Sequence, residues 1–285
     1  MSDVLRAGVM GWPVAHSLSP VLHGHWLKRY GIAGTYEAFP VQPDELPAAV
    51  NRLRDEGFRG TNLTVPHKEA AMALVDRIDD TARRIGAVNT LVLQDDGILS
   101  GTNTDAYGLI ENIRAFAPDQ LAAKFGDRPV VILGAGGAAR AALVGLADIG
   151  ARKIRIVNRT VARAEALAEI VADQEVDVHA MGWNERANAL GDAGLLVNTT
   201  TLGMQGQAPL DLDLGALPEA AVVNDIVYAP LETGLLAAAR QRGNPAVDGL
   251  GMLLHQARAG FRAWFGVDPA VDEELRQAVL AARAQ

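Results

Sequence analysis

Short β-type runs and amphipathic segments alternate along the first hundred residues. Runs rich in β-branched residues or alternating in polarity predict strands, at Leu5–Met10, Thr35–Phe39, Phe58–Leu63 and Ala87–Leu93. Apolar residues spaced three and four apart predict helices between them, at about Pro20–Tyr30, Asp44–Glu56 and His67–Arg84. The Asp96-Gly97 pair separates two β-type runs and predicts a hairpin turn. Strands that alternate with helices of this length predict βαβ units and a mostly parallel sheet.

A second alternating series follows a loop expected around Pro118–Pro129. Its predicted strands are Pro129–Leu133, Lys153–Val157, Val176–His179, Leu195–Asn198 and Val222–Asp225. Its predicted helices are Ala138–Gly150 and Ala162–Asp173, and two more close the chain at Met252–Phe265 and Asp272–Ala284. The whole chain is therefore expected to be an α/β protein.

Composition and charge narrow the class of function. The chain has 26 Lys+Arg against 34 Asp+Glu, a net charge of −8, which argues against nucleic acid as a partner because phosphates need a basic face. The lack of cysteine excludes disulfides, cysteine-ligated metals and a thiol nucleophile. The sequence shows neither a signal-peptide pattern nor an 18-residue uncharged apolar run, so we expect a cytoplasmic protein with no membrane partner.

A glycine-rich segment follows the strand that ends at Leu133 and opens a helix. It matches G-x-G-x-x-A, in which Gly134 allows a tight turn, Gly136 lets a pyrophosphate approach the backbone and Ala139 keeps helix and strand close. The helix N-terminus offers unsatisfied N–H groups to an anion. Such turns also occur for structural reasons alone, but the strand–turn–helix context predicts a dinucleotide site. The predicted contacts are Gly134, Ala135, Gly136, Gly137 and Ala138.

The following strand ends where an NAD site would place an acidic residue for the ribose hydroxyls. This chain has Asn158, Arg159 and Thr160 instead, and an arginine can hold a 2′-phosphate in a charge-assisted clamp. The segment Arg152–Arg163 carries five basic residues and no acidic one. The alternative is an ordinary solvated basic turn. We predict NADP rather than NAD, with Asn158, Arg159, Thr160 and Arg163 at the cofactor.

Four polar segments among the first 105 residues lie where elements end, the places at which α/β sheets bind ligands. They contain Ser17 and Ser19 in one loop, Thr61–Lys68 with Lys68 in the first turn of a helix, Asn89, and Asp105. Each has a structural interpretation as well. The serines can be helix caps, Asn89 and Asp105 can be turn or N-cap residues, and a first-turn lysine is usually solvated.

Taken in order, these segments resemble the shikimate dehydrogenase family over nearly the whole chain. The matching motifs are His16–Pro20, Asn62–Lys68, Gly86–Thr90, Asn103–Asp105 with Gly108, the Gly134 loop, Asn158–Thr160, Asn198–Thr200 with Gly203 and Met204, Asp225 with Tyr228 and Pro230, and Asp248–Gly249 with Gln256 and Ala257. The resemblance implies reduction of 3-dehydroshikimate to shikimate by NADPH in aromatic amino-acid biosynthesis. One departure is Gly24, where many relatives carry Asn, and we expect it to affect helix packing more than chemistry.

The resemblance also implies roles for individual residues. Ser17, Ser19 and Tyr228 receive the substrate carboxylate, and Asn62, Thr64, Asn89, Asp105 and Gln256 hold the ring oxygens. Lys68 is the candidate catalytic residue, oriented by Asp105, and it either transfers the proton or stabilises the alkoxide electrostatically. Ile226 and Gly249 join the cofactor contacts.

The resemblance further implies two α/β domains with the active site in the cleft between them. The substrate-binding domain is discontinuous, with residues 1–108 and 249–285, and residues 109–248 form a Rossmann-type NADP domain. The partners are then the small molecules 3-dehydroshikimate and shikimate. The sequence leaves open whether the chain is a monomer or a homodimer.

Several alternatives remain. No metal is predicted, since His23 and His25 are two apart on a helix and point in different directions. His67, beside Lys68, is expected to be structural. A dehydrogenase of quinate or a related hydroxy acid would share this fold and the Lys68–Asp105 pair. Glutamyl-tRNA reductase has a similar nucleotide loop but needs a catalytic cysteine, and a non-enzymatic NADP-binding regulator would not need Lys68 and Asp105 together.

Overall fold

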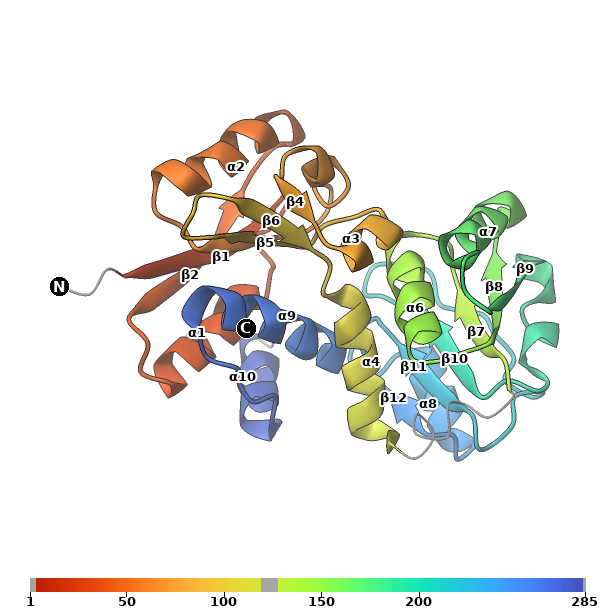
Figure 1. Cartoon of the computed structure of the whole chain (residues 1–285). Helices are drawn as coiled ribbons and strands as arrows, with labels where there is room; N and C mark the ends of the chain where they lie inside the picture. Colours follow the sequence, from red (N-terminus) through yellow and green to blue (C-terminus); the bar gives the residue numbers. More distant parts are fainter. Residues whose placement is uncertain (1–3, 119–127, 284–285) are drawn as a thin grey trace. The chain divides into compact units, whose positions relative to one another are not determined.

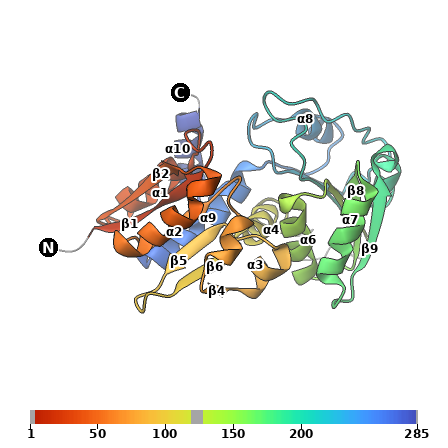
Figure 2. The same ribbon diagram turned by 90° about the horizontal axis from the view of Figure 1, so that it is seen from above.

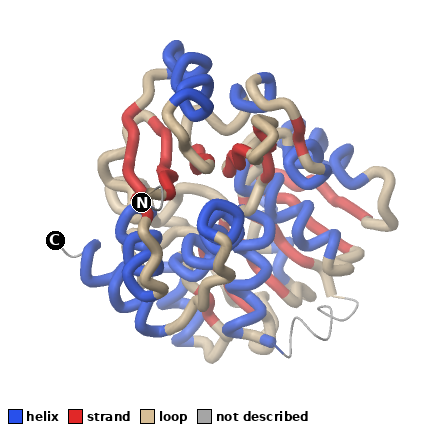
Figure 3. The backbone as a smooth tube through the Cα atoms, turned by 60° about the vertical axis from the view of Figure 1, so that its left-hand side comes forward, coloured by secondary structure: helices blue, strands red, loops and turns tan. Residues whose placement is uncertain are grey.

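The computed structural model describes residues 4–118 and 128–283 (Figure 1). Most of the loop expected around Pro118–Pro129, the chain's first three residues and the expected last helical residue, Ala284, lie outside the described residues. The chain divides into two compact units, residues 1–104 with 254–285 (the first unit) and residues 105–253 (the second unit). In both units the strands lie between helices (Figure 3). The functional domain limits at 108/109 and 248/249 stay a prediction.

The first unit contains a six-stranded mixed sheet in the order β2-β1-β3-β5-β6-β4. Its strands are β1 (Leu5–Gly11), β2 (Gly34–Pro40), β3 (Gly60–Leu63), β4 (Arg77–Ile78), β5 (Thr90–Leu93) and β6 (Leu99–Thr102). β1 runs parallel to β2 and β3, but β5 is antiparallel to both of its neighbours. The predicted hairpin turn is confirmed, with Gly97 at a φ of 83°, and this short connection requires β5 and β6 to be antiparallel. The sheet is therefore less parallel than predicted.

Helices cover both faces of this sheet, α2 on one face and α1, α9 and α10 on the other (Figure 1). The helices and 3₁₀ turns are α1 (Ser19–Arg29), η1 (Pro43–Glu45), α2 (Leu46–Asp55), η2 (Ala70–Ala73), α3 (Asp80–Ile85), α9 (Leu250–Phe265) and α10 (Glu273–Arg283). On the second face Trp26 and Phe261 are fully buried with ring centroids 5.1 Å apart, and the Trp264 indole donates to Leu91 O at 2.9 Å. These aromatic side chains join the closing helices to the sheet.

The single helix predicted at His67–Arg84 is wrong, because η2, β4 and α3 replace it. Asp76 is the reason for the extended part: its carboxylate accepts from Leu99 N at 2.7 Å while its own N–H donates to Leu99 O. The Leu99 amide and the Arg54 guanidinium both lower the pKa of Asp76. Asp79 then accepts from Ala82 N at 2.7 Å and starts a new helix as its N-cap. Side chains that bond to the backbone compete with a continuous helix.

The second unit is a fully parallel sheet in the order β12-β11-β10-β7-β8-β9. Its strands are β7 (Val130–Leu133), β8 (Lys153–Asn158), β9 (Asp177–Gly182), β10 (Leu195–Asn198), β11 (Val222–Asp225) and β12 (Ala246–Val247). The chain order reverses between β7 and β10, and in such doubly wound sheets ligands bind at the carboxyl ends of the strands at this point.

Two apolar layers hold this sheet, and its helices divide between them (Figure 2). The helices and 3₁₀ turns are α4 (Asp105–Phe116), α6 (Gly137–Asp148), α7 (Val161–Ala168), η3 (Glu169–Val171), η4 (Trp183–Glu185), η5 (Asn188–Leu190) and α8 (Gly234–Gln241). Alternate β7 residues face opposite layers, as the strand period of two requires: Val130 packs with α4, α6 and α7, and Val131 with α8. The sequence analysis did not predict α4 and α8, and α7 ends earlier than predicted.

Gly24 does not have the packing role expected for it. It lies exposed in the middle of α1, and a Cβ added there would meet no atom within 4 Å. Glycine in a helix interior is unfavourable because it loses more backbone freedom on folding than alanine does.

We therefore expect Gly24→Ala to raise the free energy of unfolding by about 0.5–1 kcal/mol. Urea denaturation followed by circular dichroism measures this change. Gly60→Ala is the matched opposite case, because a Cβ there would lie 2.0 Å from Leu91 O, and it should destabilise the protein. If the urea midpoint of Gly24→Ala is unchanged or lower than that of the wild type, the glycine does have a packing role.

Candidate functional site

In the first unit, the loops after β1 and β3 lie side by side at the carboxyl ends of these strands. Trp12 N donates to Val65 O at 3.1 Å, and Thr64 N donates to Met10 O at 2.9 Å. These bonds place Thr64 beside the loop that carries Ser17 and Ser19. The N-cap of α1 is Leu18 and no side chain caps this helix, so the capping interpretation of the serines is wrong. Ser17 Oγ accepts from Ser19 N at 3.3 Å, and its hydroxyl proton is not used in that bond.

A buried network connects three of the other predicted residues. Asn89 Oδ1 accepts from Thr90 Oγ1 at 2.9 Å and from the Thr104 amide at 2.9 Å. Thr104 Oγ1 in turn donates to Gln256 Oε1 at 3.2 Å, although the two residues are 152 positions apart. Asn62 joins the network through its amide, which donates to Asn89 O at 3.2 Å. The structure thus brings Asn62, Asn89 and Gln256 together.

Asn62 has little capacity left for a ligand. Its amide donates to Thr90 Oγ1 at 3.0 Å as well as to Asn89 O, which uses both N–H bonds. Its oxygen accepts from Tyr36 Oη at 2.6 Å. At 5 % exposure, Asn62 is a centre of the network with at most one acceptor site remaining for a substrate.

Tyr36 is a site residue that the sequence analysis missed. Its ring is stacked on His23, with centroids 3.9 Å apart and planes 7° apart. Burial raises the pKa of Tyr36 well above its ordinary value, so the phenol stays protonated and donates to Asn62. Tyr36 lies within a predicted strand, and no pattern in the sequence distinguishes it from a core aromatic residue.

Lys68 lies in a turn after β3, before η2, and not in the first turn of a helix as predicted. Its backbone is fixed, since Val88 N donates to Lys68 O at 2.8 Å, and its side chain is half-buried. His67 is buried, with Nε2 at 2.8 Å from Val41 O. A carbonyl only accepts, so Nε2 donates, and this contact gives His67 a structural role.

Asp105 and Tyr228 belong to the second unit. Asp105 is the first residue of α4 and directly follows Thr104, whose amide is held by Asn89. Tyr228 lies half-buried in the loop after β11. The proximity of Asp105 to Lys68, and of Tyr228 to the two serines, stays a prediction.

The glycine-rich turn of the second unit has the geometry that close approach to a phosphate requires. Gly134 adopts a φ of +105°, and a Cβ there would lie 2.9 Å from Thr199 Oγ1. Gly136 is exposed, and a Cβ there would meet nothing within 4 Å, so its backbone is accessible. No side chain caps α6, and its first turn carries no acidic residue. The backbone N–H groups of Gly137 and Ala138, at the start of α6, can therefore bind an anion.

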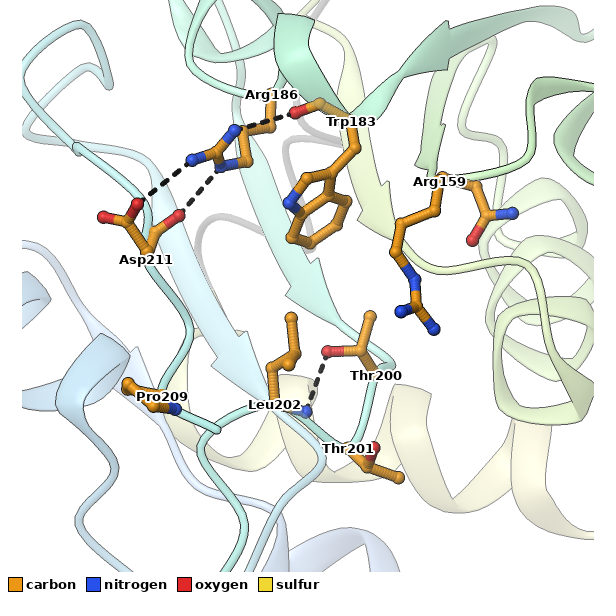
Figure 4. Close-up of a pocket in the computed structure, with 9 residues that line it drawn as sticks. Arg159, Trp183, Arg186, Thr200, Thr201, Leu202, Pro209 and Asp211 are labelled. Carbon is orange, nitrogen blue, oxygen red and sulfur yellow. Dashed lines mark hydrogen bonds and ion pairs between the residues drawn. The ribbon is translucent and has the colours of Figure 1, made fainter. Parts of the chain in front are cut away.

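A cavity of about 320 Å³ lies beside this turn, at the carboxyl ends of three strands (Figure 4). It is lined by Asn158 and Arg159 at the end of β8, Trp183 and Arg186 after β9, Thr200, Thr201 and Leu202 after β10, and Pro209 and Asp211. Its volume is at the lower end of the range of small-molecule sites, roughly 300–1,000 Å³. Trp183, Arg186 and Asp211 were not predicted, and their spacing from the motifs gave no signal.

Arg159 and Arg186 differ in whether their guanidinium groups already bind other residues of the protein. Arg186 donates to Asp211 O at 2.8 Å and to Trp183 O at 3.0 Å, and its guanidinium lies 5.5 Å from the Trp183 ring centroid. Arg159 is exposed and makes no ion pair or hydrogen bond with any residue of 4–118 or 128–283. Asn158 donates to Thr160 O at 2.9 Å, which shapes the turn that presents Arg159.

The five basic residues at Arg152–Arg163 are neighbours in the sequence, but only two of them lie together at the cavity. Arg152 and Lys153 lie at the opposite end of β8, about 20 Å or more from Arg159 at 3.3 Å per residue. Arg155 pairs with Asp192, and this side-chain hydrogen bond lowers the pKa of Asp192. Only Arg159 and the exposed Arg163 lie at the cavity end, so the five residues do not act as one patch.

Ile226 and Gly249 lie together as a cofactor site would require. A Cβ on Gly249 would lie 2.1 Å from Ile226 O, so the backbones are in direct contact. The preceding Asp225 is buried and accepts from Thr233 Oγ1 at 2.7 Å, Asn198 Nδ2 at 2.9 Å and Val227 N at 3.1 Å. Burial raises the pKa of Asp225 despite these donors. The three hydrogen bonds make the carboxylate a structural anchor of this loop.

Among residues 4–118 and 128–283, no group of three or more His, Asp or Glu side chains is arranged to hold a metal ion. None of the helices in these ranges is both long and apolar enough to cross a membrane.

Comparison with known proteins places these features in one family. Three family descriptions match consecutive parts of the chain: the shikimate dehydrogenase substrate-binding domain at residues 9–91, shikimate/quinate 5-dehydrogenase at 117–201, and the shikimate 5′-dehydrogenase C-terminal domain at 249–281. The shikimate dehydrogenase (NADP(+)) of Paramagnetospirillum magneticum is 56 % identical over 96 % of this chain and 98 % of its own length.

Solved structures agree with this assignment. Shikimate 5-dehydrogenase of Thermus thermophilus, in complex with NADP(H) and shikimate, is 39 % identical, has a TM-score of 0.85, and is matched over 98 % of this chain and 100 % of its own. Quinate dehydrogenase of Corynebacterium glutamicum, in complex with NAD, has a TM-score of 0.90 at 30 % identity, again over 98 % of this chain and 100 % of its own. On the order of its motifs, its fold and these similarities, the chain belongs to the shikimate dehydrogenase family.

Proposed function

We propose that the protein catalyses the reversible, NADPH-dependent reduction of 3-dehydroshikimate to shikimate. The observation that carries the proposal is the buried network that joins Asn62, Asn89 and Gln256, in a chain 56 % identical to a shikimate dehydrogenase (NADP(+)). Hydroxyl and amide groups suit a polyhydroxylated ring, because an unmatched buried polar group costs about 1–3 kcal/mol. The reaction belongs to the pathway that forms aromatic amino acids.

The residues of the first unit divide the work of substrate binding. Ser17 and Ser19 donate to the substrate carboxylate, together with Tyr228 of the second unit. Thr64, Asn89 and Gln256 hold the ring oxygens, and Asn62 contributes chiefly by fixing the Asn89 side of the network. This division predicts that the active site forms between the two domains, with Asp105 completing it.

Lys68 is the catalytic residue of the proposal. NADPH supplies the hydride, and the protein must then supply a proton to the alkoxide that develops on the substrate carbon. A fixed backbone and a half-buried residue suit either direct proton transfer or electrostatic stabilisation of that oxygen. Asp105 orients the lysine in both cases.

The residues around the second-unit cavity fit NADP. The N–H groups of Gly136, Gly137 and Ala138 would hold the pyrophosphate, and Ala135, Ile226 and Gly249 would lie along the cofactor. Arg159 lines the cavity, and no described side chain neutralises its charge. An arginine in this position suits a 2′-phosphate. Thr160 and Arg163 flank it.

The direct test is a spectrophotometric assay of shikimate and quinate, each with NADP and NAD. We expect shikimate with NADP to give the highest kcat/KM. A preference for quinate would instead support the hydroxy-acid dehydrogenase alternative, for which the 30 % identical quinate dehydrogenase fold is the precedent. We also propose that the enzyme acts in the cytoplasm, as a monomer or a homodimer with no nucleic-acid partner.

Lys68→Ala should lower kcat about a hundredfold or more and change the KM for shikimate little. Positioned proton transfer or alkoxide stabilisation contributes roughly 10²–10⁴ and acts mainly in the transition state. Steady-state kinetics measure the effect, with Lys28→Ala, an exposed lysine on α1, as the matched control. Near wild-type kcat in Lys68→Ala would remove Lys68 from the chemistry.

Ser17→Ala should lower kcat/KM for shikimate by roughly ten- to a hundredfold. The variant loses one hydrogen bond to a charged group, worth about 1.5–3 kcal/mol. Ser100→Ala, in the β5–β6 hairpin, is the control and should leave kcat/KM unchanged. If Ser17→Ala behaves like the control, Ser17 only supports the turn before α1.

Arg159→Ala should weaken NADP binding by roughly thirty- to a thousandfold, about 2–4 kcal/mol, and leave NAD almost unaffected. The quantity to measure is the ratio of kcat/KM with NADP to that with NAD. Arg152→Ala removes one positive charge at the far end of β8 and is the control. It should not change the ratio if the position of Arg159, and not only the net charge, determines NADP binding. An unchanged ratio in Arg159→Ala would overturn the cofactor assignment and leave that of Lys68 intact.

A further inference from the structure

The second-unit cavity has an aromatic wall that none of the predicted cofactor residues supplies. Trp183 follows β9 and is half-buried, and its indole lies between Arg186 and Arg159 (Figure 4). Its indole N–H makes no hydrogen bond with any residue that the structure describes. A flat apolar ring on the wall of a cavity at the carboxyl ends of parallel strands is suited to stack on a second flat ring.

Arg186 fixes one face of this indole. Its guanidinium donates to Trp183 O, Asp211 O and Asp211 Oδ2, at 3.0, 2.8 and 3.3 Å. The guanidinium, 5.5 Å from the ring centroid, covers that face by a cation–π contact. The donors of Arg186 are therefore used to hold the tryptophan and the Asp211 segment.

The charges divide the cavity into two ends. Asp211 lies at the Arg186 end, and its carboxylate would repel an anion there. Arg159 lies at the other end with no carboxylate partner among the described residues. A phosphate therefore belongs at Arg159, and the neutral aromatic part of the same ligand belongs on the Trp183 side.

We propose that Trp183 binds the adenine ring of NADP by stacking, and that Arg186 is the positioning residue that holds its indole in place. This inference rests on the proposed function, because it assigns one part of the cofactor to one part of the cavity. Base–aromatic stacking is worth enough to weaken binding about tenfold when the aromatic ring is lost. It adds affinity for NAD and NADP alike, whereas Arg159 distinguishes them.

Two fragments of the cofactor separate these contacts: adenosine 2′,5′-bisphosphate and AMP, titrated into the full-length protein by calorimetry. Trp183→Ala should weaken both fragments about tenfold, and Trp183→Phe should keep both within about threefold. Arg159→Ala should weaken the bisphosphate alone. In a Trp183→Ala background, Arg186→Gln should have no further effect, because Arg186 acts through Trp183.

Tryptophan fluorescence gives a readout that does not depend on the stability of Trp183→Ala. Emission of the wild type should fall when AMP binds, and emission of Trp183→Phe should not. The proposal is overturned if Trp183→Ala binds both fragments like the wild type, or if the emission of both proteins responds equally to AMP. If the wild type binds neither fragment, the NADP assignment itself fails.

Discussion

The polar edge of the first unit depends on the buried side-chain amides of Asn62 and Asn89. Through them, β2 is joined to β3 by the Tyr36–Asn62 bond, β3 to β5 by Asn62 and Thr90, and β5 to the end of β6 by Asn89 and Thr104. A buried donor or acceptor left unpaired costs about 1–3 kcal/mol, so each member of this network constrains its neighbours. The network brings Gln256, from the far end of the chain, to Thr104.

The second unit solves a different problem, namely how a chain of net charge −8 attracts an anionic cofactor. The attraction depends on which arginines of this unit are not already paired with an aspartate. Arg155 is neutralised by Asp192 and Arg186 by Asp211, so these two residues add little to the field at the cavity. Arg159 keeps its charge, and the uncapped start of α6 adds the partial charge of a helix terminus.

Much of this organisation could be predicted from the sequence, and the failures have identifiable physical causes. Strand–helix alternation and the Gly134 turn are local patterns, and they predicted most of the second unit but missed α4, α8 and the short strand β12. The helix expected at His67–Arg84 failed because Asp76 bonds to Leu99, a partner 23 positions away. Tyr36 and Trp183 were missed for the same reason: their roles come from neighbours such as His23 and Arg159, which only the folded chain places beside them.

The aspartates with shifted pKa values respond to acid in two opposite ways, and the second unit contains both kinds. The pKa of Asp76 is lowered by the Leu99 amide and that of Asp272 by the Leu275 amide, so their stabilising effect is present above the unfolded pKa of 3.8 and is lost as pH falls through their lowered values. Burial raises the pKa of Asp225, so its effect has the opposite sign: it is fully present below 3.8 and is lost as pH rises through the raised value. In the second unit, Asp225 therefore opposes the acid sensitivity of Asp192, whose pKa is lowered by Arg155. In the first unit the effects of Asp76 and Asp272 have the same sign, so acidification removes the stabilising effect of both.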